Sequence, residues 1–222
     1  MNNNYEIITR EAYRNKKRAE SYQSQFDGIF SWARIAMNRE LEITKRVIDH
    51  YSVSEKDIIL DAPCGTGIAG LMLSKLPSKV IATDISNEMM EYAIDSYSAD
   101  QFMGFLQADV ASLPLSDRAV VGVIVLGFMH RVPVEIKLLT LRELTRVTSN
   151  FIVVSITVDS FLYRAKKLVR RLLGKENRAA PEPLDYDSIV DIVNKEGLQI
   201  RGITKVVPLF SSEIILWLEK NN

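Results

Sequence analysis

The segment Ile59-Leu-Asp-Ala-Pro-Cys-Gly-Thr-Gly67 decides the fold of this 222-residue chain. Its first residues belong to a short apolar run at 57–61, which is typical of a buried β-strand. This run ends in an acid, Asp61, and is followed by a loop that contains Pro and Gly. The apolar residues at 68–76 then predict a short helix. A strand, a glycine-containing turn and a helix form the first unit of an open α/β sheet.

The same alternation continues along the chain. Apolar runs predict further strands at 79–83, 102–107, 119–126, 151–158, 199–207 and 213–219. Helices are expected at 39–50 and 87–97, from Pro133 onward, and between Asp185, as N-cap, and Gly197. Five strands that alternate with helices predict a doubly wound α/β fold, and the short link between the last two strands predicts an antiparallel pair.

Three acids follow three successive predicted strands: Asp61, Asp84 and Asp109. In open α/β sheets, ligands bind beyond the carboxyl ends of the strands, where the strand order reverses. Asp84 alone could simply cap the 87–97 helix, although Ser86 could do so instead, and Asp109 alone could be a common turn residue. Together, they favour a binding site.

The loop after the first strand suits a ligand with an amino-acid tail. Gly65 and Gly67 let the backbone approach a ligand closely, and the start of the next helix favours a carboxylate or phosphate. Asp61 could accept hydrogen bonds from an ammonium group, Asp84 from both ribose hydroxyls, and Asp109 from an adenine amino group. The pattern therefore predicts a site for a nucleoside joined to an amino acid.

These residues resemble the class I S-adenosylmethionine (SAM)-dependent methyltransferases, especially their small-molecule branch. The similarity covers roughly residues 20–220, and its matching blocks are LDAPCGTG (60–67), ATDIS (82–86), QADVASLPLSD (107–117), LGFMHRVP (126–133) and LRELTRV (141–147). It implies a seven-stranded, mostly parallel sheet with the last strand antiparallel. It also implies SAM as cofactor, S-adenosylhomocysteine (SAH) as product, and methyl transfer to an oxygen, nitrogen or carbon atom of a small molecule.

The resemblance also assigns cofactor-binding residues. The methionine part of SAM maps to Asp61, Ala62, Gly65 and Gly67, the ribose to Asp84, and the adenine surroundings to Ile85, Asp109 and Val110. Relatives often carry an aromatic residue in an N-terminal lid, which maps to Tyr22 and Phe26, although simple helix packing is an equal alternative.

His130 is the candidate catalytic base, because it follows the fourth strand near the expected methyl group and its ordinary pKa suits proton removal. The alternative is a loop histidine that only shapes the pocket. Cys64 is interpreted as a small packing residue in the loop, because a nucleophilic role would need a neighbouring base.

Two peripheral segments are expected around a single domain that spans 1–222: N-terminal helices or a lid at 1–50, and a basic helical insertion at 158–184. Within the insertion, residues 161–175 (FLYRAKKLVRRLLGK) have one apolar face and several basic residues on the others. Such a helix either packs on the domain or contacts an anionic membrane, or it gathers an anionic or lipid-like acceptor.

Composition narrows the class of partner. Twenty-eight basic residues balance twenty-eight acidic ones, so no nucleic acid is expected as partner. The N-terminal residues lack the apolar core of a signal peptide, and no run approaches the ~20 apolar residues of a membrane span. With one cysteine and two histidines, we expect a cytoplasmic protein without a metal site; the oligomeric state is left open.

Two other functions fit parts of the pattern. The segment GTGIAG (65–70) satisfies the dinucleotide fingerprint, so an NAD-dependent oxidoreductase is one alternative, although Ala62, Pro63 and Cys64 separate its first glycine from the strand. A SAM-binding module that has lost catalysis is the other, because no residue in the sequence guarantees turnover.

Overall fold

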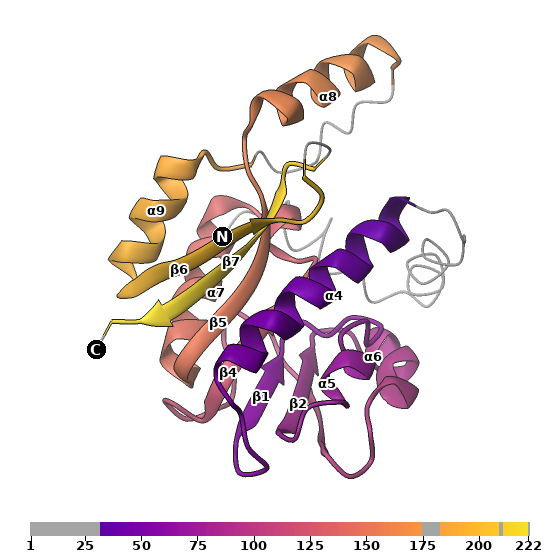
Figure 1. Cartoon of the computed structure of the whole chain (residues 1–222), viewed down its shortest axis with the longest axis vertical. Helices are drawn as coiled ribbons and strands as arrows, with labels where there is room; N and C mark the ends of the chain where they lie inside the picture. Colours follow the sequence, from indigo (N-terminus) through magenta and orange to yellow (C-terminus); the bar gives the residue numbers. More distant parts are fainter. Residues whose placement is uncertain (1–31, 175–182, 209–210, 222) are drawn as a thin grey trace.

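The computed structural model describes residues 32–174, 183–208 and 211–221 and contains a seven-stranded sheet of order β3-β2-β1-β4-β5-β7-β6 (Figure 1). The strands are β1 (Ile58–Asp61), β2 (Lys79–Asp84), β3 (Phe102–Gln107), β4 (Val120–Val125), β5 (Thr148–Thr157), β6 (Leu198–Lys205) and β7 (Glu213–Lys220). Strands β1 to β5 pair in parallel, and β7 is antiparallel to both β5 and β6. The predicted fold is confirmed.

Helices cover both faces of the sheet. They are α4 (Trp32–His50), α5 (Gly70–Leu73), α6 (Asn87–Ala93), α7 (Val134–Val147), α8 (Phe161–Leu172) and α9 (Tyr186–Lys195), with 3-10 turns η2 (Ile94–Ser96) and η3 (Met129–Arg131). In one hydrophobic core, apolar residues of α4, α5 and α6 pack against the sheet. In the other core, apolar residues of α7 and α9 pack against the sheet. Successive strand residues alternate between the two: Ile59 belongs to the first core and Leu60 to the second.

Helix boundaries differ from the expected ones in several places. A single helix, α4, continues from Trp32 through the expected helix at 39–50, where the sequence predicted a separate helix before residue 39. Helix α5 covers only four residues because turns and bends occupy 65–69 and 74–78. Strand β5 begins at Thr148, three residues early, and Pro133 is the N-cap of α7 rather than its first residue. The predicted caps are confirmed: Ser86 Oγ accepts from the amide of Met89, and Asp185 from that of Ser188.

Helix α8 stands away from the sheet (Figure 1). It has no buried residue, and Phe161 and Leu172 are 87% and 77% exposed. The alternative in which its apolar face packs on the domain is therefore wrong for the described part of the chain. None of the helices within the described ranges is both long and apolar enough to cross a membrane.

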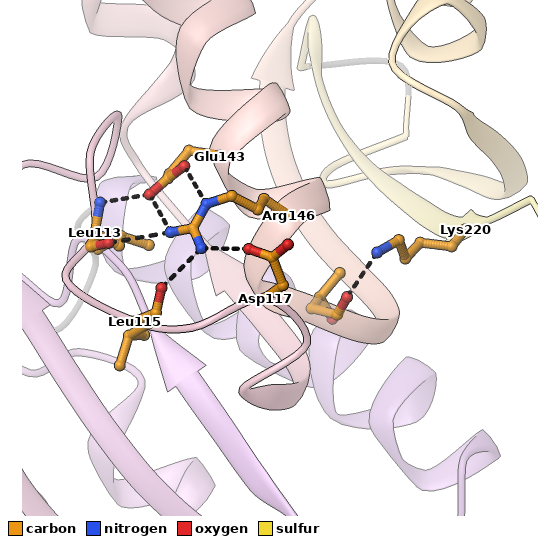
Figure 2. A network of polar contacts seen from close by, with 7 residues as sticks. Leu113, Leu115, Asp117, Glu143, Arg146 and Lys220 are labelled. Carbon is orange, nitrogen blue, oxygen red and sulfur yellow. Dashed lines mark hydrogen bonds and ion pairs between the residues drawn. The ribbon is translucent and has the colours of Figure 1, made fainter.

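A polar network fixes the loop that follows β3 (Figure 2). Glu143 Oε1 accepts from the amide of Leu113 at 2.6 Å, and the Arg146 guanidinium donates to the carbonyls of Leu113 and Leu115 at 3.1 and 2.8 Å. Arg146 also pairs with Asp117 at 2.8 Å. The LRELTRV block thus holds the segment after Asp109 against α7, which positions one edge of the site described below.

Candidate cofactor-binding and active site

A cavity of about 340 Å³ opens at the carboxyl ends of the parallel strands, on both sides of the β1–β4 boundary. The strand order reverses there, since β2 and β3 lie on one side of β1 and β4 and β5 on the other. Its lining divides into two groups. Over β3, β2 and β1 lie Asp61, Gly65, Asp84, Ile85, Asp109 and Val110; over β4, β5 and β7 lie His130, Arg131, Thr157 and Glu213, with Glu40 from α4.

Asp84 organises the glycine loop. Its Oδ2 accepts from the amide of Gly65 at 2.9 Å and its Oδ1 from the amide of Ser86 at 2.9 Å. Burial raises the pKa of this carboxyl, and backbone hydrogen bonds from Ser86, Gly65 and Ile85 oppose the shift. A carboxylate offers about four lone-pair positions, so Asp84 keeps acceptor capacity for a ligand diol.

Asp61 lies buried at the end of β1 and accepts a hydrogen bond from the Tyr97 hydroxyl at 2.7 Å. Burial, with a smaller contribution from the charge of Asp84, raises the pKa of Asp61 to about 7. A buried carboxyl of this kind gains its charge most easily when a cation binds beside it. The site is therefore suited to a ligand ammonium group.

The other predicted cofactor residues fall into three groups. Asp109 lines the cavity and accepts from the amide of Ala111 at 3.0 Å, with Val110 and Ile85 beside it. Ala62 is fully buried in the core and Gly67 packs on Ala93, so both shape the loop from behind rather than line the cavity. Tyr22 and Phe26 lie outside the described residues.

His130 lines the cavity as expected, but its surroundings do not favour a base. Burial, with the nearby charges of Arg131 and Lys137, lowers its pKa to about 3. The imidazole is thus neutral at physiological pH, and the 3.8 Å from its Nδ1 to Glu213 Oε1 exceeds a hydrogen bond. These features favour the pocket-shaping role. Cys64 is buried with its thiol pKa raised, mainly by burial, which disfavours a nucleophile.

Sequence reasoning missed Glu40 and Glu213, whose carboxyls contact each other in the half of the cavity over β4, β5 and β7. Burial raises the pKa of both carboxyls, and the charge of Glu213 adds to the shift of Glu40, whose pKa lies at about 8. One signal was available: Ala33, Ala36, Met37 and Glu40 recur at helical spacing and form the cavity-facing stripe of α4. Glu213 merely begins a strand, and only the folded sheet brings it to the site.

Among residues 32–174, 183–208 and 211–221, no group of three or more His, Cys, Asp or Glu side chains is arranged to hold a metal ion.

The strand order and the cavity at the carboxyl ends of the strands are those of the class I methyltransferase fold. Residues 59–150 match the family described as "Methyltransferase domain", which confirms the resemblance seen in the sequence. The classic dinucleotide-binding order 3-2-1-4-5-6 lacks the inserted antiparallel strand seen here, which disfavours the oxidoreductase alternative.

Individual relatives are similar over different spans. Malonyl-[acyl-carrier protein] O-methyltransferase from Pectobacterium atrosepticum is 39% identical over 62 residues, which are 28% of this chain and 23% of that protein. Its Yersinia pestis counterpart is 31% identical over 102 residues, 46% of this chain and 33% of that protein. The matches thus span a third or less of these curated relatives.

Solved structures share the fold over a longer span. Magnesium protoporphyrin IX methyltransferase from Synechocystis PCC 6803, crystallised with SAH, superposes with a TM-score of 0.80 at 18% identity and covers 97% of this chain and 100% of that one. At this identity the similarity defines the architecture rather than the acceptor.

Proposed function

We propose that this protein is a SAM-dependent methyltransferase that transfers a methyl group to an oxygen, nitrogen or carbon atom of a small molecule. The observation that carries the proposal is the placement of Asp61, Asp84 and Asp109 around one cavity, beside the Gly65 loop. In this assignment Asp61 receives the ammonium group, Asp84 the ribose diol, and Asp109, Val110 and Ile85 surround the adenine.

Bound SAM supplies an already activated methyl group. The protein's contribution is then to hold the acceptor in line with that group and to exclude water. The cavity suits this task, because the β1–β3 side binds the nucleoside and leaves the β4–β7 side for the acceptor.

Isothermal titration calorimetry with SAM, SAH and NAD tests the proposal. We expect binding of SAM and SAH and none of NAD. Incubation of the SAM-loaded protein with metabolite extracts, followed by measurement of SAH formation, distinguishes an enzyme from a SAM-binding module without catalysis. Binding of NAD but not SAH would contradict the assignment.

Asp61 predicts how cofactor binding depends on pH. In the ligand-free protein its pKa is about 7, so at lower pH it must lose a proton before it can pair with the ammonium group. The affinity for SAH should therefore rise as pH increases from 6 to 7.5. Calorimetry across this range measures the slope, and Asp61→Asn should flatten it and weaken binding by about 10-fold or more, the usual value for a hydrogen bond to a charged group. An equal slope in the variant would contradict this role.

Helix α8 supports a further part of the proposal, an anionic or lipid-like partner. Its exposed apolar residues include Phe161 and Leu172, and its last turn carries Arg170 and Arg171. We expect the protein to sediment with vesicles that contain anionic lipid and not with neutral ones. Phe161→Ser should reduce the sedimented fraction, and sedimentation independent of lipid charge would contradict the proposal.

A single domain over 1–222 and a cytoplasmic location complete the proposal. The buried single cysteine, Cys64, is consistent with that location.

A further inference from the structure

The cavity continues beyond the proposed cofactor half into a polar chamber over β4, β5 and β7. Its wall contains Glu40 of α4, His130 and Arg131 of η3, Thr157 of β5 and Glu213 of β7. Thr157 and Glu213 are cross-strand partners, so the chamber floor is part of the sheet itself. A rigid floor and a helical wall are suited to holding a ligand group in one orientation.

Glu40 and Glu213 form a hydrogen-bonded carboxyl pair. Two carboxyls in such contact hold one proton between them, because two adjacent negative charges are unfavourable in a buried site. Ser155 fixes the orientation of Glu40: its Oγ accepts from the amide of Gly127 at 2.9 Å, which leaves its hydrogen for the Glu40 carboxyl.

The described lining of this chamber contains buried polar atoms without a hydrogen-bond partner. Glu40 Oε1 and His130 Nδ1 are both buried and make no hydrogen bond to the protein. Buried polar atoms are nearly always hydrogen-bonded in folded proteins, so an unpaired one in a cavity wall indicates a place for a ligand. Because Glu40 Oε1 lies in a carboxyl pair with one net negative charge, a ligand that donates hydrogen fits it.

The net charge of the chamber also limits the ligand. The negative charge of the Glu40–Glu213 pair faces the positive charge of Arg131, which stabilises the ionised form of both carboxyls. Among the described residues that line the chamber, Arg131 supplies the positive charge, and the acidic pair already balances it. An added carboxylate would therefore lie against the acidic pair without a further cation from these residues. A neutral hydroxyl or amine meets no such repulsion.

We propose that the Glu40–Glu213 pair is the methyl-acceptor subsite and that it selects a reacting hydroxyl or neutral amine over a carboxylate. This inference rests on the proposed function and adds the chemical class of the reacting group. The pair binds the hydrogen of that group, while His130 borders it as a neutral side chain.

Binding of three matched probes tests the selectivity: 4-methylphenol, 4-methylaniline and 4-methylbenzoate share one ring and differ in the reacting group. Saturation-transfer NMR on the SAH-saturated protein gives their dissociation constants. We expect the phenol and the aniline to bind at least about tenfold more tightly than the benzoate. Glu213→Gln should reduce this preference by about tenfold or more, whereas Glu91→Gln, an exposed residue of α6, should keep it.

The results separate the two proposals. Glu40→Gln and Glu213→Gln should keep SAH affinity, because neither residue lies in the cofactor half. A protein that fails to bind SAH would contradict the proposed function. Intact SAH binding with equal or tighter binding of 4-methylbenzoate, or a preference unchanged in Glu213→Gln, would overturn this inference alone.

Thermal unfolding gives a readout that needs no acceptor. The pKa of Glu40 is raised from 4.5 to about 8 in the folded protein. The contribution of the protonated Glu40 carboxyl to the free energy of unfolding is therefore fully present below pH 4.5 and is lost as pH rises through about 8. The groups that face it are Glu213 from β7 and His130 and Arg131 from η3. The Tm of the unmodified protein should therefore fall relative to that of Glu40→Gln between pH 5.5 and 8.5. Parallel curves would show that the pair shares no proton and would overturn the inference.

Discussion

Replacing Asp84 with alanine lowers the affinity for SAM and SAH by about 10²–10⁴-fold, the largest expected effect on binding. In the proposed site Asp84 accepts two hydrogen bonds from the ribose diol, and a hydrogen bond to a charged group contributes about 1.5–3 kcal/mol. The substitution also removes the acceptor of the Gly65 and Ser86 amides at 2.9 Å, which loosens the loop that we propose contacts the methionine part. Calorimetry with SAH measures the loss.

A matched acid separates this effect from a change in net charge. Asp100 is exposed in the turn before β3 and does not line the cavity, so Asp100→Ala should bind SAH like the unmodified protein. Circular dichroism at the assay temperature verifies that Asp84→Ala remains folded. An Asp84→Ala protein that is folded and binds SAH within about threefold of the unmodified protein would contradict the ribose assignment.

Replacing Gly67 with alanine has the largest expected effect on stability. Its φ of +78° is unfavourable for an L side chain, and an added Cβ would lie 2.8 Å from Ser96 Oγ and 2.9 Å from Ala93 Cα. Backbone strain of about 1–2 kcal/mol and overpacking of about 1–3 kcal/mol together predict a loss of about 2–5 kcal/mol. For a protein of this size the Tm should fall by roughly 5–15 °C in a thermal melt.

Gly65 provides the internal comparison. It also has a positive φ, +53°, but an added Cβ would meet no atom within 4 Å. Gly65→Ala should therefore incur only the backbone strain and lower the Tm by less than half as much as Gly67→Ala. Equal effects would show that overpacking of the added Cβ against Ser96 and Ala93 does not contribute to the loss of stability in Gly67→Ala.

The two halves of the cavity differed in how far the sequence predicted them. Asp61, Asp84 and Asp109 end three successive strands, and parallel strands carry their carboxyl ends to one edge, so spacing alone predicted their convergence. Glu40 and Glu213 are 173 positions apart, in a helix and in the antiparallel strand, and no local pattern links them. His130 was placed correctly, but its burial, which lowers its pKa, depends on residues from other elements.

The sequence by itself determined the order of the elements, the parallel sheet, the antiparallel final strand and the convergence of Asp61, Asp84 and Asp109 on one cavity. These features follow from hydrophobic periodicity and from the position of each acid at the end of its strand. Only the tertiary structure decided three other features: the exposed apolar face of α8, the pairing of Glu40 with Glu213, and the protonation of the buried acids. Each depends on which distant elements pack together, since burial and neighbouring charges, rather than the residue type, set solvent exposure and pKa.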